Sequence, residues 1–581
     1  MLEFGRARFA PPLMRHWFES LPRLTRLTLH GGLLLCALAI YGLIVSHRTI
    51  DLEPTQALTE APLILYLFLL LRVPLRDQRW SSLVAAFPII WAYGVHDEYW
   101  IKLGSVPNFV DFAMLPDLFA AVGPMQIALT CLLIASPLLL WLGLLDRRPK
   151  APRRMLLWLA LPAIVAIGFV RAAPARAYQA IDRVTFDEEW TDGLTADHWG
   201  RLYTLFMREI RRRSFAQGLS GFTTLLRSSI YVDRTLQAKL ERRNVHVIVL
   251  ESFIDVRLLR AVRFSEPPLA PSFTRWADPF ISSSVSPVFG GETARAEFEV
   301  LCGVPSLRLY ALEFLSFSGA PTYCLPNILK DAGYHTLLSF PHGPVFFNTR
   351  RAYPGLGFEE RIFGDAHSQP GQESIKQYGQ PYLHDLDLFP QNLAKVQKLM
   401  RAGKPFLNYV LTIYGHWPFE IDERQHPSRI DVSSDHARGA LGDVRKLSNQ
   451  MRERTQALDA YLQGLHEVDP NGLVVMVADH LPPLPGGKAD YEQLGYAQRD
   501  RLPEAAEGSR LYENFLLVVD RGQARKLPLM RHFDLPHWIL NELSHGAYCQ
   551  QKQCDFGALP LLSERYVDAY RTILGLAGRV R

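Results

Sequence analysis

Apolar residues crowd the first 171 positions of this 581-residue chain, whereas the remaining 410 have the mixed composition of soluble protein. Five apolar runs stand out there, at residues 27–45, 57–71, 81–95, 118–145 and 155–171. The first and fourth are long enough to cross the roughly 30 Å of hydrocarbon in a bilayer, while the second and third are short and contain Pro62 and Pro88. Buried helices of a soluble protein are the weaker explanation, because the runs are clustered. The pattern predicts an α-helical membrane domain of five spans over residues 1–171.

The positive charges around these runs predict their orientation. Lysine and arginine are frequent before the first run and in the turns 72–80 and 146–154, but scarce in the loops 46–56 and 96–117. Basic loops stay in the cytoplasm, so residues 172–581 are expected outside the cytoplasm. The first run lacks a small-residue cleavage site and is interpreted as a retained anchor rather than a signal peptide. The net charge of +5 comes mostly from these topological arginines and predicts no nucleic acid partner.

The cysteines agree with an external location for the second part of the chain. Cys36 and Cys131 fall in the apolar runs, and the external part has an even number of cysteines, as expected where disulfides form. Neighbours in the sequence suggest the pairs Cys302–Cys324 and Cys549–Cys554, one of the three ways to pair four cysteines. Four free buried thiols are the less favoured alternative.

Residues 172–240 are rich in arginine and have no strand signal, which predicts a helical linker. In the stretch 197–215, one helical face carries Trp199, Leu202, Phe206 and Ile210, with most arginines elsewhere. Such a helix could lie on an anionic lipid surface. A linker helix that packs on the next domain is the favoured interpretation.

From residue 241 to 581 the pattern predicts one α/β domain. Short apolar runs read as buried strands of the kind found in a parallel sheet, and helical stretches lie between them. The expected strands are 245–250, 335–340, 406–414, 473–478 and 515–520, and the expected helices include 325–334 and 452–468. Alternating strands and helices imply a doubly wound sheet, whose ligands bind beyond the carboxyl ends of the strands.

Residues suited to metal binding follow four of these predicted strands. They are Glu251, His342, His416, and the adjacent pair Asp479 and His480. Glu251, Asp479 and His480 would supply three oxygen or nitrogen ligands and leave a fourth position open. A single histidine at a strand end is more often a structural hydrogen-bonding group, but the coincidence at four strand ends makes that explanation poor for the set.

The stretch VFGGETARAEFEVLCG, residues 288–303, places Thr293 before an expected helix. Threonine at a helix start is commonly an N-cap. The same position suits a nucleophile, because the helix dipole and free amides stabilise an alkoxide or a phosphate there. A hydroxyl coordinated to a divalent cation also loses its proton more easily. Thr293 is therefore either a cap or the fourth ligand and nucleophile.

Residues 244–545 resemble the alkaline phosphatase/sulfatase superfamily. The whole chain resembles its membrane branch, which includes lipoteichoic acid synthases, periplasmic glucan phosphoglycerol transferases and phosphoethanolamine transferases. The motifs that carry this resemblance are VLESF, GETARAEF, PHGPVFFNTRRAY, YGHWPF and VADH. Gly291, Thr293, Glu297 and Phe298 match the lipoteichoic acid synthase pattern G-x-T-x-x-x-E-F.

The resemblance implies roles for individual residues. Glu251, Thr293, Asp479 and His480 would bind Mn²⁺, with Zn²⁺ or Mg²⁺ as alternatives. His342, Phe347, Arg350 and His416 would form the head-group pocket. Two departures affect the pocket: the family often has tryptophan where Phe347 falls, and the arginine could be Arg351.

The expected function is a two-step transfer of a phospholipid head group, through a phosphodiester on Thr293, to a glycan or polymer acceptor. His416 or His342 would protonate the departing diacylglycerol. Phosphatidylglycerol is the expected donor and phosphatidylethanolamine the alternative. A catalytically inactive lipid-sensing membrane regulator is a third hypothesis. A sulfate ester hydrolase is disfavoured, because LCGVPSLR at 301–308 is only a near match to the C-x-P-x-R motif.

Overall fold

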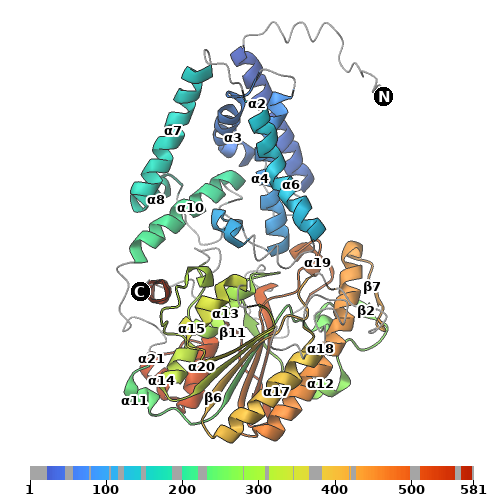
Figure 1. Cartoon of the computed structure of the whole chain (residues 1–581). Helices are drawn as coiled ribbons and strands as arrows, with labels where there is room; N and C mark the ends of the chain where they lie inside the picture. Colours follow the sequence, from blue (N-terminus) through green and yellow to red (C-terminus); the bar gives the residue numbers. More distant parts are fainter. Residues whose placement is uncertain are drawn as a thin grey trace. The chain divides into compact units, whose positions relative to one another are not determined.

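The computed structural model describes most of the chain (Figure 1). The described residues are 23–45, 56–76, 80–103, 106–114, 124–145, 152–185, 196, 199–219, 232–278, 280–307, 313–343, 346–364, 383–417, 419, 427–496, 511–556 and 564–578. The chain forms two compact units. The first comprises residues 1–98, 105–107 and 122–214, and the second comprises 99–104, 108–121 and 215–581.

Within the described residues, each of the five predicted apolar runs contains an α-helix. The helices are α2 (Arg23–Val45), α3 (Gln56–Arg72), α4 (Ser81–Leu103), α6 (Pro124–Gly143) and α7 (Pro152–Ala172), followed by α8 (Pro174–Thr185) and α10 (Arg201–Gly218). Within the described ranges, no single helix has the length and apolarity to cross a membrane, although Leu156–Ala172 and Pro174–Ile181, bent by 115°, satisfy that test as a pair. The predicted orientation depends on the loop 46–56 and the basic turn 146–154, of which residues 46–55 and 146–151 lie outside the described residues.

The fully buried residues of helix α10 include only Leu202 of its predicted apolar face. Phe206 is 39% exposed, whereas Arg201 and Arg208 are buried together with Leu202. Both Nε and Nη2 of Arg201 donate to the Asp97 carboxylate, at 2.6 and 3.0 Å, and Arg208 donates to the Val106 carbonyl. Polar partners inside the first unit therefore set the orientation of this helix, which a pattern of apolar residues does not reveal.

A nine-stranded mixed sheet forms the centre of the second unit. Its strand order is β11 (Met530–Arg531), β3 (Ser282–Val285), β9 (Glu513–Asp520), β8 (Leu473–Ala478), β1 (Val245–Leu250), β6 (Phe406–Leu411), β4 (His335–Phe340) and β5 (Glu360–Phe363), with β10 (Gln523–Arg525) paired to β9. A separate two-stranded sheet joins β2 (Arg263–Phe264) and β7 (Val432–Ser433). Strands β1, β4, β6 and β8 run parallel, and each has at least five buried residues.

Two predicted strands differ from the structure. Strand β9 pairs antiparallel with β8, with Val477 opposite Leu516. It begins beside the carboxyl end of β8, so the chain re-enters the sheet at the edge it has just left and must run in the reverse direction. Its residues are as buried as those of the parallel strands, so the sequence pattern carries no information about direction. Strand β6 ends at Leu411 rather than at residue 414.

Helices cover both faces of the sheet (Figure 1). On β1, Val245, Val247 and Val249 belong to one hydrophobic cluster, and Ile248 and Leu250 belong to the other. The first cluster includes residues of α13 (Thr293–Cys302), α14 (Leu325–Asp331), α15 (Thr349–Leu356), α20 (Asp534–Leu543) and α22 (Glu564–Ala577). The second includes residues of α12 (Pro271–Ala277), α17 (Asp385–Ala402) and α18 (Leu441–Val468). The predicted α/β fold of the sulfatase type therefore has three layers.

Shorter elements complete the second unit. The short α-helices are α11 (Arg234–Gln237), α19 (Lys488–Gln493) and α21 (Ala547–Lys552). The 3₁₀-helices are η1 (Phe109–Met114), η4 (Val256–Leu258), η5 (Glu313–Ser316), η6 (Phe346–Asn348) and η7 (Arg438–Ala440). Disulfides join Cys302 at the end of α13 to Cys324 before α14, and Cys549 to Cys554 at α21. This is the pairing that sequence proximity suggests.

Candidate metal and nucleophile site

Strand register places two acidic residues side by side at one edge of the sheet. Leu250 of β1 lies opposite Ala478 of β8, and Glu251 and Asp479 directly follow them. The Asp479 amide donates to the Leu250 carbonyl at 3.1 Å, which extends the ladder by one bond. Ligand atoms of Glu251, Asp479 and His480 all lie within 4.8 Å of one another, and all three residues are buried. The fold therefore brings together three of the predicted metal ligands.

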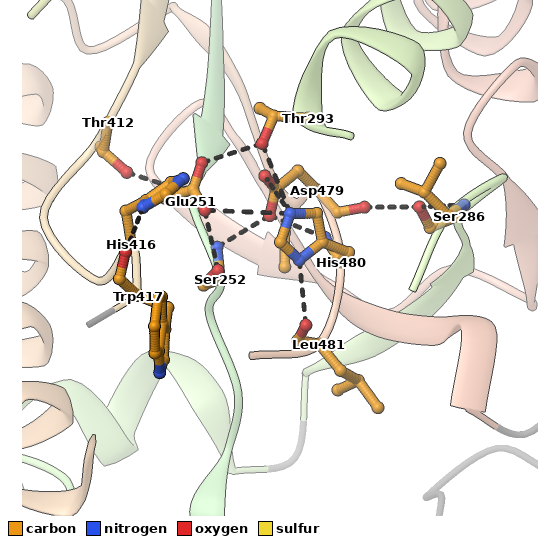
Figure 2. A network of polar contacts seen from close by, with 12 residues as sticks. Glu251, Ser252, Ser286, Thr293, Thr412, His416, Trp417, Asp479, His480 and Leu481 are labelled. Carbon is orange, nitrogen blue, oxygen red and sulfur yellow. Dashed lines mark hydrogen bonds and ion pairs between the residues drawn. The ribbon is translucent and has the colours of Figure 1, made fainter. Parts of the chain in front are cut away.

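Thr293 contacts this cluster instead of capping its helix. Helix α13 has Glu292 as its N-cap residue, and Thr293 is its first helical residue. The Thr293 hydroxyl donates to Glu251 Oε2 at 2.9 Å and lies 3.4 Å from His480 Nε2 (Figure 2). Its position at the helix start adds the favourable field of the helix dipole for developing negative charge. Of the two roles open at Thr293, the geometry supports the one within the metal and nucleophile site.

The lone pairs of this cluster are arranged as a divalent cation requires. Asp479 Oδ1 accepts the amides of Ser252 and His480 at 2.8 and 2.7 Å, whereas its buried Oδ2 has no hydrogen bond to any described residue. His480 Nδ1 lies 2.9 Å from the Leu481 carbonyl, which assigns the ring hydrogen to Nδ1. The unprotonated Nε2 then faces Asp479 Oδ2 at 3.2 Å. Second hydrogen bonds of this kind orient metal-binding imidazoles, so these residues fit a cation.

Electrostatics of the site also favour a cation. Burial, together with the neighbouring Glu251 carboxylate, raises the pKa of Asp479 well above its usual range. Burial lowers the pKa of His480. Burial alone would raise the pKa of Glu251, but the His416 and His480 imidazoles and hydrogen bonds from Ser252 and Thr293 lower it. A divalent cation would relieve the repulsion between the two carboxylates.

The predicted pocket residues lie at neighbouring strand ends. His416 follows β6, and its Nδ1 lies 2.6 Å from the Trp417 carbonyl. Figure 2 shows His416 in the same polar network as Glu251. His342 follows β4 and is half-buried, Phe347 lies in η6, and Arg350 lies exposed in the first turn of α15. That these four side chains form one head-group pocket stays a prediction.

Three hydroxyl residues around the cluster were missed by sequence reasoning. Ser252 has a left-handed backbone (φ 46°), and its hydroxyl donates to Glu251 Oε1 at 2.7 Å. Thr412 accepts the Glu251 amide at 2.9 Å, and Ser286 donates to the Asp479 carbonyl. Ser252 stands next to Glu251 in VLESF, and Thr412 lies inside the predicted strand 406–414. A sequence signal therefore existed at Ser252, whereas Thr412 was hidden by the strand being predicted too long.

The sulfatase family model matches residues 243–541, which is more than half of the chain and includes every residue of the cluster. The chain belongs to the sulfatase family. The family match confirms the resemblance of the motifs to the alkaline phosphatase/sulfatase superfamily. The similarity to lipoteichoic acid synthases supports the branch that the same motifs indicate.

Curated relatives of this sulfatase-family chain match only part of its length. A protein assigned to cyclic beta-1,2-glucan modification in Rhizobium meliloti is 24% identical over 44% of this chain and 37% of its own length. A lipoteichoic acid synthase-like protein of Bacillus subtilis is 28% identical over 33% of this chain and 29% of its own. The chain thus spans less than two fifths of either relative.

Among solved structures, a phosphoglycerol transferase of Streptococcus pyogenes in complex with sn-glycerol-1-phosphate has a TM-score of 0.45 and 15% identity, and the match covers 64% of this chain and 91% of that one. The lipoteichoic acid synthase LtaP of Listeria monocytogenes has a TM-score of 0.42 and 18% identity, and the match covers 56% of this chain and 77% of that one.

Proposed function

We propose that this protein is a metal-dependent transferase that moves a phospholipid head group onto a glycan or polymer through a covalent phosphothreonine. The observation that carries the proposal is the hydrogen bond from the Thr293 hydroxyl to Glu251 Oε2 at 2.9 Å, inside a buried cluster of potential metal ligands. A nucleophile needs a neighbouring group that accepts its proton or stabilises its anion. Thr293 has both a carboxylate partner and a helix start.

The first step exchanges one phosphate ester bond for another. The Thr293 oxygen bonds to the phosphorus of the head group while the bond from phosphorus to the diacylglycerol oxygen breaks. The hydroxyl hydrogen leaves along its hydrogen bond to Glu251 Oε2, and the departing oxygen takes a proton from His416 or His342, the general-acid role. In the second step the acceptor hydroxyl gives its proton to the histidine that acted as the acid, and its oxygen bonds to phosphorus. The bond from phosphorus to the Thr293 oxygen breaks, and that oxygen takes back the proton held by Glu251.

Four residues would hold the cation: Glu251, Thr293, Asp479 and His480. Carboxylate, hydroxyl and imidazole donors suit Mn²⁺, and also Zn²⁺ or Mg²⁺. When bound, the ion would lower the pKa of the coordinated hydroxyl and stabilise charge on the phosphoryl oxygens. We assign the head-group pocket to His342, Phe347, Arg350 and His416, in which the exposed Arg350 guanidinium would pair with the phosphate.

Phosphatidylglycerol is the proposed donor, because GETARAEF matches the pattern of lipoteichoic acid synthases residue for residue. Phosphatidylethanolamine is the second candidate, because disulfide cysteines close to the nucleophile helix resemble the ethanolamine branch. Sulfate ester hydrolysis is not proposed despite the family name. Cys302, the cysteine of the near match to the sulfatase motif, is bonded to Cys324.

We further propose that residues 1–171 anchor the protein in a bacterial plasma membrane by five helices. Residues 172–240 would connect this anchor to the catalytic domain, 241–581, on the periplasmic or extracellular side. The support is the alternation of basic turns with loops poor in lysine and arginine. An anchored domain would remain beside its lipid donor.

A covalent adduct tests the proposal directly. The purified full chain, with Mn²⁺, is incubated with vesicles of phosphatidylglycerol or phosphatidylethanolamine, quenched, digested and analysed by mass spectrometry at the peptide containing Thr293. Glycerophosphate and phosphoethanolamine add different masses, so the donor is identified by the same measurement. An unmodified Thr293 with both lipids would favour the inactive sensor.

A further inference from the structure

The site description leaves out one fully buried arginine. Arg454 lies in the middle of α18 and has no exposed surface. Its Nε donates to Asp385 Oδ2 at 2.8 Å, and neither side chain of this ion pair is exposed. Desolvating a guanidinium costs free energy, which the hydrogen bonds of the buried group must offset.

The two terminal nitrogens of the Arg454 guanidinium support the backbone of the proposed metal ligand Glu251 by hydrogen bonds. Arg454 Nη1 donates to the Glu251 carbonyl at 2.8 Å. Its Nη2 donates to Thr412 Oγ1 at 3.2 Å, and the same oxygen accepts the Glu251 amide at 2.9 Å. Both polar groups of the Glu251 backbone are therefore fixed by Arg454, one directly and one through Thr412. Figure 2 shows Thr412 beside Glu251.

The loop that leads to His416 is packed against the same guanidinium. Gly415, which precedes His416, has φ 122°. A Cβ atom there would overlap Arg454 Nη1 and lie 3.0 Å from the Glu251 carbonyl oxygen. Only glycine combines this backbone with this close approach. One side chain thus contacts the backbone next to a proposed metal ligand and the backbone next to the proposed general acid.

We propose that Arg454 is a positioning residue, which aims the Glu251 carboxylate at the metal and holds the His416 loop against it. This inference rests on the proposed function, because it requires Glu251 to be a ligand. Removing the hydrogen-bonding support of a metal ligand typically weakens metal binding by about 10- to 100-fold.

Arg243 provides a matched control at the opposite edge of the sheet. It lies before the start of β1, is buried, pairs with Asp520, and donates to the carbonyls of Asn471 and Gly472 at 2.6 and 3.2 Å. Arg243→Lys therefore perturbs the same kind of buried pair without contacting Glu251.

The experiment measures Mn²⁺ affinity of the purified full chain by isothermal titration calorimetry, with thermal unfolding of each preparation. Arg454→Lys should weaken Mn²⁺ binding by about 10-fold or more, whereas Arg243→Lys should stay within twofold of wild type. Thr412→Val removes the bridging hydroxyl and should also weaken binding, and Thr412→Ser, which keeps it, should restore binding.

Wild-type affinity in folded Arg454→Lys and Thr412→Val would overturn the proposal. If Arg454→Lys does not fold, the comparison of Thr412→Val with Thr412→Ser decides. The proposed function itself would be wrong if wild type did not bind Mn²⁺ or if Glu251→Gln bound it with wild-type affinity. In either case the proposed role of Arg454 would also be wrong.

Discussion

The Tyr409 hydroxyl of β6 donates to Glu297 Oε1 at 2.8 Å, one turn along the helix that begins with Thr293. Tyr353 of α15 donates to the same oxygen at 3.0 Å. Burial, together with the Asp479 and Glu251 carboxylates, raises the pKa of Glu297 to about 8, although the hydrogen bonds from the two tyrosines lower it. Glu297 of the G-x-T-x-x-x-E-F pattern thus links α13 to β6 and α15, and its raised pKa favours the neutral carboxyl near pH 7.

Glu297 should make the stability of the protein depend on pH. Between its ordinary pKa of 4.5 and about 8, the folded carboxyl holds a proton that the unfolded chain has released. The unfolded state then binds fewer protons, so this contribution to stability decreases as pH rises through that window. Glu297→Gln imitates the protonated form at every pH. Its stability relative to wild type should rise from pH 5 to pH 8, by up to about 1.4 kcal/mol per pH unit.

Thermal unfolding of chelator-treated wild type and Glu297→Gln, at several pH values, measures this difference. The exposed Glu467→Gln is the control and should follow wild type. Parallel curves for wild type and Glu297→Gln would mean that Glu297 is ionised in the folded state.

Loss of a metal ligand should remove the stabilisation that the metal provides. A ligand that binds only the folded state at 100 times its Kd adds about 2.7 kcal/mol. Mn²⁺ should therefore raise the unfolding temperature of wild type, and Glu251→Gln and Asp479→Asn should abolish the rise and lower the metal content. Metal analysis of the dialysed variants provides the second measurement. Full occupancy in both would show that the ligand set is wrong.

Much of the second unit could be predicted because buried parallel strands are apolar along their whole length. The runs 245–250, 335–340 and 473–478 are strands with those bounds. Strand β3 has the sequence SSSV, which gives no run of apolar residues to recognise. Its serines are buried with hydrogen-bond partners, as where Ser282 Oγ accepts the Leu527 amide at 2.7 Å. The direction of β9 depends on where the chain re-enters the sheet. Neither is encoded in a local pattern.

The candidate site was predictable to the extent that its residues follow strands. Glu251, Asp479 and His480 stand directly after strand ends, where parallel neighbours bring them together. Arg454 was not predictable, because it lies within a long amphipathic helix that has two further arginines, Arg445 and Arg452. Both of these are partly exposed, and they pair with Asp431 and Glu266. Only tertiary contact distinguishes Arg454 from them.

The disulfide between Cys302 and Cys324 should contribute more stability than the one between Cys549 and Cys554. The bonds close sequence separations of 22 and 5 residues, which corresponds to roughly 3 and 2 kcal/mol by loop entropy. Replacing each pair by alanine and measuring denaturant midpoints tests the order. Peptide mapping under non-reducing conditions checks the bonds themselves, and free thiols at 302 and 324 would end this prediction.

The proposed topology places the carboxyl terminus outside the cytoplasm. A reporter that works only after export, fused after residue 580, should be active, and a reporter that works only in the cytoplasm should be silent. Fusions in the basic turn at 146–151 should give the reverse result, because that turn is proposed to be cytoplasmic. An active cytoplasmic reporter at residue 580 would contradict the arrangement.

Thr293 allows the sharpest separation of fold from chemistry. Because Glu292 is the N-cap residue and the Thr293 hydroxyl bonds Glu251, Thr293→Ala should not carry the roughly 1 kcal/mol cost of a lost threonine cap. It should remain folded yet form no lipid-derived adduct, and head-group transfer should fall by orders of magnitude, since the covalent intermediate cannot form. Thr293→Ser keeps a hydroxyl and should retain the adduct. The measurement pairs thermal unfolding with transfer from phosphatidylglycerol vesicles on the same preparations. A Thr293→Ala protein that is destabilised but still transfers would make the hydroxyl structural and remove the nucleophile from the proposed mechanism.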